Sequence, residues 1–246
     1  MIIDFHTHVD EAEAFGWIDP PEKIVGLLDE AGIDKAVIMT YTDLPGMNAG
    51  ALDYIVRAAE KFPGRLIPFV RLNPNYREQM PALIAESVAR GVRGIKLHPT
   101  TTLAHPAGDA TLDVLRLAGD AGLPVLFHCG DDPYTTPQTL ALAAAAAPEC
   151  TLVFGHMGGY AHVEDAIAAA QDHANIVLET SAMPYPALIA DAIERVGAER
   201  VIFGSDGPGC NPKLELAKIR GLNLSTEHEQ AVLGRNAARL LGLEQR

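Results

Sequence analysis

The sequence lacks the features of several large protein classes. Its 246 residues include only 19 Lys and Arg against 32 Asp and Glu, which gives a formal net charge of −13. A nucleic-acid surface needs clustered Lys and Arg, so we expect no nucleic-acid partner. No apolar run approaches the roughly 18 residues that a membrane-spanning helix needs, so we expect no membrane partner either. A soluble globular protein with a small-molecule substrate fits this composition.

Cysteine is scarce, and two common catalytic signatures are missing. The three cysteines, Cys129, Cys150 and Cys210, are widely spaced and form no CxxC pair, which argues against a disulfide scaffold and favours a reducing compartment. The first predicted strand begins at the second residue and leaves no room for a signal peptide, so we expect a cytoplasmic protein. No G-x-S-x-G elbow accompanies the histidines and no G-x-G-x-x-G follows the first strand, which disfavours serine hydrolases and dinucleotide-dependent enzymes.

Short apolar runs typical of buried strands recur along the whole chain. They predict eight strands: Ile2–His8, Ala36–Thr40, Leu66–Leu72, Gly94–His98, Val125–Cys129, Leu152–His156, Ile176–Thr180 and Val201–Ser205. Amphipathic helical patterns separate them, so the strands should be parallel and joined by crossover helices. Eight such units favour an α/β fold of the closed (β/α)8 barrel type over an open doubly wound sheet. No Gly/Ser-rich linker divides residues 1–246, which we therefore predict to form one domain.

The C-terminal segment adds helical residues after the eighth unit. Thr226 and Glu229 have the spacing of a capping box before an apolar pattern that reaches Leu243. We expect this segment to pack on the barrel exterior and to have a structural role. Exterior helices can face solvent or another subunit with the same apolar pattern, so a monomer and a homo-oligomer both stay open.

Seven polar residues stand at the ends of predicted strands: His6, His8, Lys96, His98, His128, His156 and Asp206. In a (β/α)8 barrel the catalytic groups lie at the carboxyl ends of the strands. Residues i and i+2 of a strand share a face, so the two histidines of the first strand should converge. Histidines on predicted helices are expected to be solvated instead, namely His162, His173 and His228.

The strand-end residues include a donor set that suits a divalent metal ion. Imidazole nitrogens of His6, His8 and His128, together with a carboxylate oxygen of Asp206, could build a mixed N/O site that leaves room for water. This composition suits one catalytic Zn²⁺, while Mn²⁺ or another divalent ion would also fit. Glu179 and Ser181, at the end of the seventh strand, could orient ligands or substrate.

Six motifs in this order resemble those of the amidohydrolase superfamily, with the closest likeness to its amidohydrolase-2 branch. They are Ile3-Asp4-Phe5-His6-Thr7-His8, Gly94-Ile95-Lys96-Leu97-His98-Pro99, His128, Gly155-His156-Met157-Gly158-Gly159, Phe203-Gly204-Ser205-Asp206-Gly207-Pro208 and Asn236-Ala237-Ala238-Arg239-Leu240. The resemblance spans nearly the whole chain. That branch contains metal-dependent TIM-barrel hydrolases, lactonases and non-oxidative decarboxylases.

The resemblance assigns roles to individual residues. His6 and His8 match the metal ligands of strand 1, His128 that of strand 5, and Asp206 the carboxylate of strand 8. His156 matches the strand-6 histidine, which polarises substrate or moves a proton in mononuclear relatives and can bind a second ion in binuclear ones. We therefore expect Asp206 and His156 to be catalytic, with Asp206 accepting a proton from metal-activated water.

Two cationic side chains have more than one interpretation. Lys96 matches the position of the carboxylated lysine that bridges two metal ions in binuclear members. It also shares strand parity with His98, so the two could bind an anionic substrate, which is the interpretation we favour. Arg71, at the end of the third strand, could pair with a substrate carboxylate. A structural ion pair is the alternative for both Lys96 and Arg71.

These inferences together predict a metal-dependent hydrolase. Its substrate would be a small, carboxylate-bearing molecule with an amide, lactone or related carbonyl bond. A non-oxidative decarboxylase could use the same ligands and is the first alternative. A barrel that binds metal and ligand without catalysis is the second, because a fold alone does not establish activity.

Overall fold

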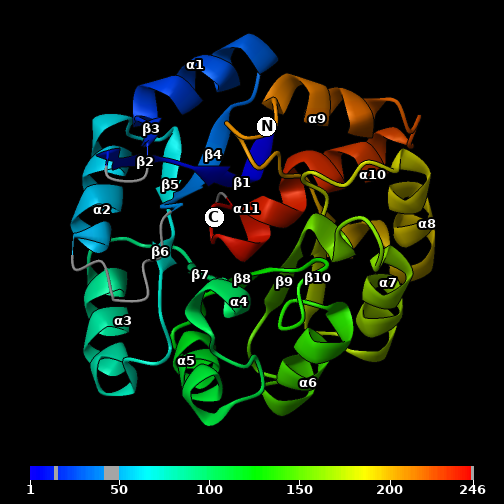
Figure 1. The fold of residues 1–246 in the computed structure, drawn as a ribbon. Coiled ribbons are helices and arrows are strands. Elements are labelled where there is room, and N and C mark those ends of the chain that lie inside the picture. Colours follow the sequence, from blue (N-terminus) through cyan, green and yellow to red (C-terminus); the bar gives the residue numbers. More distant parts are fainter. Residues whose placement is uncertain (14–15, 42–49, 245–246) are drawn as a thin grey trace.

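The computed structural model describes residues 1–13, 16–41 and 50–244, whose central strands form a ring inside a layer of helices (Figure 1). The eight predicted strands are all present, the third of them as two short pieces. In chain order they are β1 (Ile3–His8), β4 (Lys35–Met39), β5 (Leu66–Pro68) with β6 (Val70–Arg71), β7 (Ile95–Leu97), β8 (Val125–His128), β9 (Leu152–Gly155), β10 (Ile176–Glu179) and β11 (Val201–Ile202).

The strands pair in parallel in the order β1-β4-β5 and β6-β7-β8-β9-β10-β11. Backbone hydrogen bonds bridge both ends of these two sheets. Phe69 N donates to Ile38 O at 2.9 Å and Val70 N donates to Gly94 O at 3.0 Å, so the β5–β6 segment joins them on one side. On the other side Phe5 N donates to Phe203 O at 3.0 Å. The predicted (β/α)8 barrel is confirmed.

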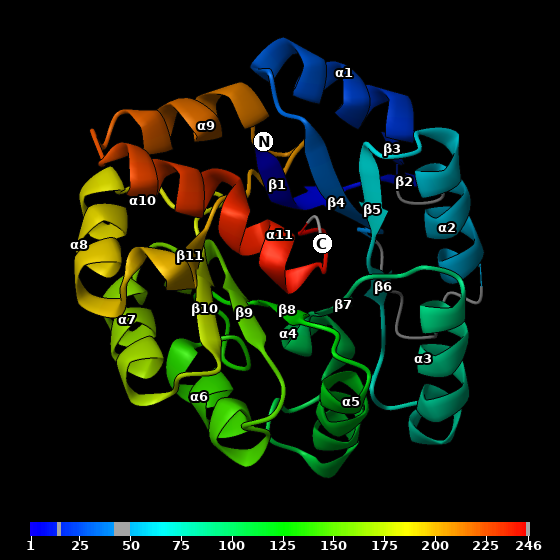
Figure 2. The ribbon, with the colours of Figure 1, turned by 180° about the vertical axis from the view of Figure 1, so that it is seen from behind.

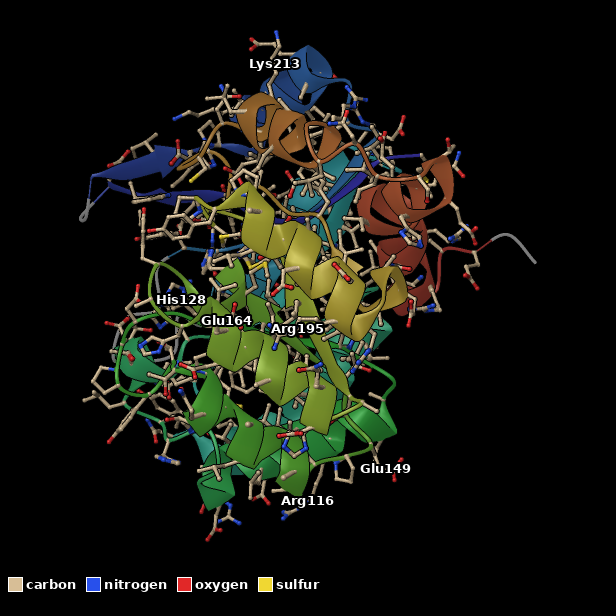
Figure 3. All side chains as sticks on the ribbon, turned by 90° about the vertical axis from the view of Figure 1, so that its right-hand side faces the viewer. Arg116, His128, Glu149, Glu164, Arg195 and Lys213 are labelled. Atoms are coloured by element: carbon tan, nitrogen blue, oxygen red, sulfur yellow. The ribbon has the colours of Figure 1, made fainter. Side chains whose placement is uncertain are left out.

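Helices cover the outside of the ring, as the view from behind also shows (Figure 2). Their bounds are α1 Pro21–Ala31, α2 Ala51–Lys61, α3 Met80–Ala89, α5 Asp109–Asp120, α6 Pro137–Ala146, α7 Val163–Asp172, α8 Pro186–Val196 and α9 Pro212–Arg220. The short helix α4 (Pro99–Thr102) lies instead in the loop after β7 (Figure 1). Several helices begin with proline at the first turn, where the missing N–H costs no hydrogen bond. Neighbouring helices also form ion pairs, such as Arg195 of α8 with Glu164 of α7 at 2.7 Å (Figure 3). A small hairpin, β2 (Asp10–Ala12) with β3 (Trp17–Asp19), follows β1.

The C-terminal segment does not lie where the sequence predicted. It consists of α10 (Thr226–Gln230), a π-helical turn (Ala231–Arg235) and α11 (Asn236–Leu240). Ala237 and Leu241 pack with Ile3 and Phe5 in the core inside the barrel, and α11 crosses the middle of the ring in both views (Figures 1 and 2). The segment thus closes the amino end of the barrel, because its small apolar residues fit against the first residues of the strands.

The helix cap of this segment also differs from the expectation. Ser225, one residue before Thr226, is the N-cap, and its Oγ accepts a hydrogen bond from His228 N at 3.2 Å. Both residue types cap helices well, so the sequence alone offered two adjacent candidates.

Among the described residues, no helix is long and apolar enough to cross a membrane.

The closure of the amino end depends on Asn236. Its buried Nδ2 donates to Ala198 O at 2.7 Å and to Val201 O at 2.9 Å, next to the start of β11. Replacing Asn236 with Ala leaves both buried carbonyl groups without this donor, and we expect a loss of about 2 kcal/mol in the free energy of unfolding. Urea denaturation measures this loss. The exposed Gln230→Ala change serves as the control and should stay within about 0.5 kcal/mol of the parent; an equal loss in both variants would contradict the assignment.

Candidate functional site

A bulge in β1 aims its histidines into the barrel mouth. Asp4 pairs with Ala36 and Thr7 with Ile38, so three steps along β1 oppose two along β4. Phe5, within this shift, packs in the inner core, and strict alternation would send His6 to the opposite face. The extra residue allows the side chains of Phe5 and His6 both to point inward. Bulges beside functional sites commonly redirect a side chain in this way.

His6 lies in a fully buried chain of polar groups. Its Nδ1 is 2.9 Å from Glu179 Oε2, and its Nε2 is 2.9 Å from Lys96 Nζ. An ammonium group can only donate, so Nε2 is the acceptor and the imidazole proton resides on Nδ1, which donates to Glu179. This arrangement directs the lone pair of Nε2 toward the centre of the site. A carboxylate behind a histidine is the usual way to orient a metal-binding imidazole.

The carboxyl group of Glu179 organises more than His6. Its oxygens also accept hydrogen bonds from the backbone N–H of Ser181 at 2.5 Å and of His156 at 3.2 Å. Ser181 Oγ donates to Glu179 Oε2 at 2.8 Å. Burial raises the pKa of Glu179, so its negative charge depends on these donors. The expectation that Glu179 and Ser181 orient other groups agrees with these contacts.

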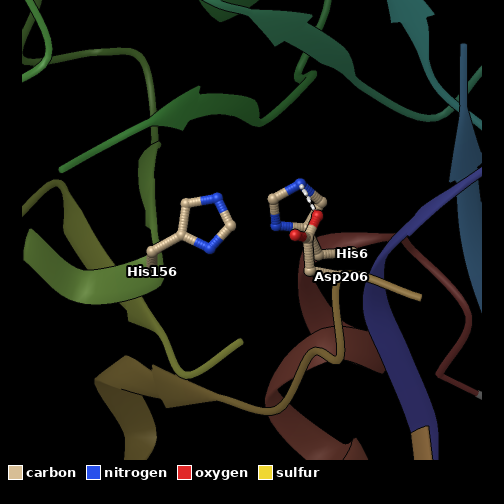
Figure 4. A group of neighbouring side chains, drawn as sticks. All are labelled: His6, His156 and Asp206. Carbon is tan, nitrogen blue, oxygen red and sulfur yellow. Dashed lines mark ion pairs between the residues drawn. The ribbon is translucent and has the colours of Figure 1, made fainter. Parts of the chain in front are cut away.

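Asp206 and His156 face His6 across the mouth of the barrel (Figure 4). Asp206 Oδ1 is 3.1 Å from His8 Nε2 and 3.6 Å from His6 Nε2. The ring of His156 is 4.9 Å from that of His6, and its Nδ1 is 3.2 Å from Ser181 O. Ligand atoms of His6, His156 and Asp206 lie within 4.8 Å of one another, so two nitrogens and one oxygen could hold a divalent ion.

Two of these residues have strained backbones. His156 has a φ of 64° and Asp206 a φ of 62°, in the left-handed region that non-glycine residues seldom adopt. Hydrogen bonds hold both in place, from His156 N to Glu179 and from Asp206 N to His6 O at 2.7 Å. Strain of this kind clusters at functional sites, where the surrounding structure supports it.

His128 lies beside this group rather than within it. Its ring is 4.7 Å from that of His156 and stacks on His98 at 4.1 Å with an interplanar angle of 7°. A ligand atom each from His98, His128 and Asp132 also lies within 4.8 Å of the others. The lone pairs of two parallel rings lie in parallel planes and do not converge, so we do not assign a second ion to this trio. The structure thus brings three of the four predicted ligands into direct contact and leaves His128 on the adjacent wall.

The charge states suit metal binding. Burial holds the pKa of His6 well below its usual range, and it also lowers that of His8 and His128. The pKa of His156 falls to about 4, mainly through burial. Burial raises the pKa of Asp206, but the hydrogen bond with His8 and the nearby positive charges outweigh it and lower the value to about 2. At neutral pH the imidazoles are neutral and Asp206 is ionised, which are the forms that bind a cation.

Two cavities meet at His128, His156 and Asp206. One, of 160 Å³, also contains the predicted substrate-binding residues; its lining is completed by His8, Tyr41, Arg71, Lys96, His98 and Thr101. Arg71 is held there by a hydrogen bond from Nη1 to Thr40 O at 3.2 Å. The other cavity, of 280 Å³, is completed by Gly130, Asp131, Asp132, Gly159, Tyr160 and Ala182. The structure thus brings together every residue that the sequence indicated for the site.

Sequence reasoning missed the role of Asp4. It is fully buried, and its Oδ1 accepts hydrogen bonds from Ser205 N at 2.8 Å and from His6 N at 3.2 Å. Asp4 therefore ties β1 to the segment that carries Asp206. A carboxylate between the apolar residues Ile3 and Phe5 was the signal that could have indicated it.

The fold defines a class of protein, the TIM-barrel proteins, and in this chain a group of possible metal ligands lies at the carboxyl end of the strands. Within that class the chain belongs to the amidohydrolase family, in its amidohydrolase-2 branch, whose profile matches residues 3–243. The family is metal-dependent. None of the curated protein sequences matches this chain.

Several solved structures are similar over the full length. A putative 2-pyrone-4,6-dicarboxylic acid hydrolase from Pseudomonas putida shares 20% sequence identity at a TM-score of 0.80, with 100% of this chain and 98% of that chain covered. A dihydroxybenzoic acid decarboxylase from Polaromonas sp. JS666, with bound manganese and 2-nitroresorcinol, shares 16% at 0.78 over 100% and 98%. An uncharacterized TIM-barrel protein from Bordetella bronchiseptica shares 21% at 0.81 over 98% of each chain. At these identities the likeness shows the fold.

The approach of Glu179 to His6 requires a glycine at position 204. A Cβ there would lie 2.3 Å from Glu179 Oε1 and 3.0 Å from His6 Cβ. Gly204→Ala should therefore displace the carboxylate and lower the free energy of unfolding by about 1–3 kcal/mol. Denaturant titration provides the measurement. Gly26→Ala in α1 is the control: the added Cβ would meet nothing within 4 Å, so the change should be neutral or stabilising. If Gly204→Ala were tolerated equally well, the position of Glu179 would not depend on a glycine at 204.

Proposed function

We propose that this protein is a metal-dependent hydrolase of small, carboxylate-bearing amides, lactones or related carbonyl compounds. The observation that carries the proposal is the 160 Å³ cavity, in which Arg71 and Lys96 line the same space as His8, His156 and Asp206. A cavity with two cationic side chains favours an anionic substrate, and a planar guanidinium suits a carboxylate. The adjacent imidazoles and carboxylate supply the groups for carbonyl chemistry.

The residues present fit a divalent cation. We assign His6, His8 and Asp206 as ligands, because Nε2 of both histidines lies within 3.6 Å of Asp206 Oδ1; His128, on the shared wall of the cavities, completes the set by family resemblance. Neutral imidazoles with one carboxylate favour Zn²⁺, and Mn²⁺ suits the same donors. When bound, such an ion lowers the pKa of water and polarises a carbonyl group.

The charge states of Asp206 and His156 give them distinct tasks. Asp206, whose pKa is lowered to about 2, is ionised and can accept the proton of the attacking water. The carbonyl of Ser181 can only accept, so Nδ1 of His156 carries the proton and Nε2 offers its lone pair. His156 is therefore a second proton acceptor, able to receive a proton and return it to the leaving group.

Lys96 and Arg71 would hold the substrate carboxylate beside these groups. Lys96 is almost fully buried, so its charge acts in a poorly solvated space. Its contact with His6 Nε2 also means that Lys96 and a metal ion would compete for that lone pair. We propose that Lys96 turns toward the substrate when the ion is bound.

Non-oxidative decarboxylation is the second candidate. The full-length likeness to a decarboxylase with bound manganese supports it, and the same cationic cavity could hold the carboxylate that leaves as CO2. A barrel that only binds ligand is the third candidate, and any catalytic turnover rejects it.

The metal assignment predicts that removal of two ligands abolishes metal binding. Protein purified without chelators should contain about one divalent ion per chain, and replacing His6 and His8 together with Ala should abolish stoichiometric binding, because two of the nitrogen donors are removed. Elemental analysis measures the content. The exposed His228→Ala change is the control and should keep the full complement. Full metal content in the double variant would show that the site lies elsewhere.

Isotope incorporation distinguishes the two chemistries. Turnover of carboxylate-bearing amides and lactones in H2¹⁸O should place one ¹⁸O atom in the acid product, because water supplies the new oxygen. Mass spectrometry of the product and of the released gas makes this measurement. CO2 release without solvent oxygen in the product would reject the hydrolase and establish the decarboxylase.

A further inference from the structure

The loop after β10 positions a serine between the two central histidines. Ser181 Oγ is 3.2 Å from His6 Nδ1 and 3.0 Å from His156 Nδ1, and Ser181 O is 3.2 Å from the latter atom. Ser181 Oγ gives its proton to Glu179, so it accepts at both Nδ1 atoms and supports the tautomer in which each Nδ1 carries the proton. The location of the Ser181 backbone thus controls the direction in which both histidines present their lone pairs.

An ion pair on α9 holds this loop from the outside. Lys218 Nζ donates to Thr180 O at 2.9 Å, to Met183 O at 2.8 Å and to Glu215 Oε2 at 2.5 Å. Glu215 Oε2 in turn accepts the backbone N–H of Ala182 at 3.1 Å. The two carbonyl groups that flank the turn and the amide within it are therefore all held by one pair of side chains.

The ion pair between Lys218 and Glu215 is largely buried. The side chain of Lys218 is 10% exposed and that of Glu215 is 14% exposed, so water screens their interaction weakly. All three ammonium donors are used. Ala182, between the held groups, has a φ of 52°, a left-handed conformation that a non-glycine residue adopts at a cost. A free loop would relax from this shape and move Ser181.

We infer that Lys218 and Glu215 are positioning residues for the reaction, acting through Ser181 on the orientation and tautomer of His156 and His6. Neither side chain lines one of the two cavities of the site or contacts a proposed metal-ligand atom. Because α9 directly follows the Asp206 segment, the pair also couples the loop after β10 to the loop that carries Asp206. The inference rests on the metal site proposed above.

The test compares Lys218→Met with Lys213→Met. Both changes remove one positive charge from α9, but Lys213 is exposed and lies at the periphery of the molecule (Figure 3). In Lys218→Met we expect Zn²⁺ affinity of the metal-free protein to fall about 10- to 100-fold, as is typical when support of metal ligands is lost. Calorimetric titration with Zn²⁺ alone gives the affinity, and Lys213→Met should match the parent.

A second readout does not involve metal or turnover. Imidazole ¹⁵N shifts in the metal-free parent should show His156 protonated at Nδ1, and Lys218→Met should show a mixture of tautomers. Unchanged ¹⁵N shifts together with unchanged Zn²⁺ affinity would overturn the inference. If Lys218→Met does not fold, Glu215→Gln replaces it: weaker Zn²⁺ binding than the parent supports the inference, and parental affinity overturns it. A parent that binds no Zn²⁺ would instead reject the metal site itself.

Discussion

The contact between Glu179 and Nδ1 of His6 is the interaction on which the rest of the site depends. It is fully buried and directs the lone pair of the imidazole toward Asp206. The same carboxylate holds the backbone of His156 in its strained conformation. Gly204 leaves the space for this carboxylate, and Ser181 Oγ donates a hydrogen bond to it. One buried carboxyl group thus orients His6 of β1 together with the segments that follow β9 and β10.

The two ends of the barrel have different tasks. At the amino end α11 packs small apolar side chains against the first residues of the strands and seals the core. At the carboxyl end, buried histidines, a buried lysine and the left-handed backbones of His156, Ala182 and Asp206 lower the stability. We infer that the packed amino end and the hydrogen bonds between the parallel strands offset this cost. In TIM barrels the amino end commonly serves stability and the carboxyl end carries the functional groups.

The sequence predicted the barrel, and it predicted that the candidate site residues lie together at one rim, because both depend on local patterns. Strands that alternate with helices pair in parallel, so all their carboxyl ends lie at one rim of the barrel. His6, His128, His156 and Asp206 stand at such ends and therefore reach the same rim. The bulge in β1 was not predictable, since it arises from pairing with β4 rather than from the residues of β1. The stacking of His128 on His98, and the support of Ser181 by Lys218, depend on contacts between distant segments. The packing of α11 across the amino end of the barrel was missed because an apolar helix face can pack there or on the barrel exterior.

We propose that His6, His8 and Asp206 hold one divalent ion at the carboxyl end of the barrel. Anomalous diffraction from crystals grown with Mn²⁺ or Zn²⁺ tests it most directly. We expect one strong peak at bonding distance from Nε2 of both histidines and from the Asp206 carboxylate, with Lys96 Nζ displaced from His6. A peak at His98, His128 and Asp132 with the contact between Lys96 and His6 intact would contradict it.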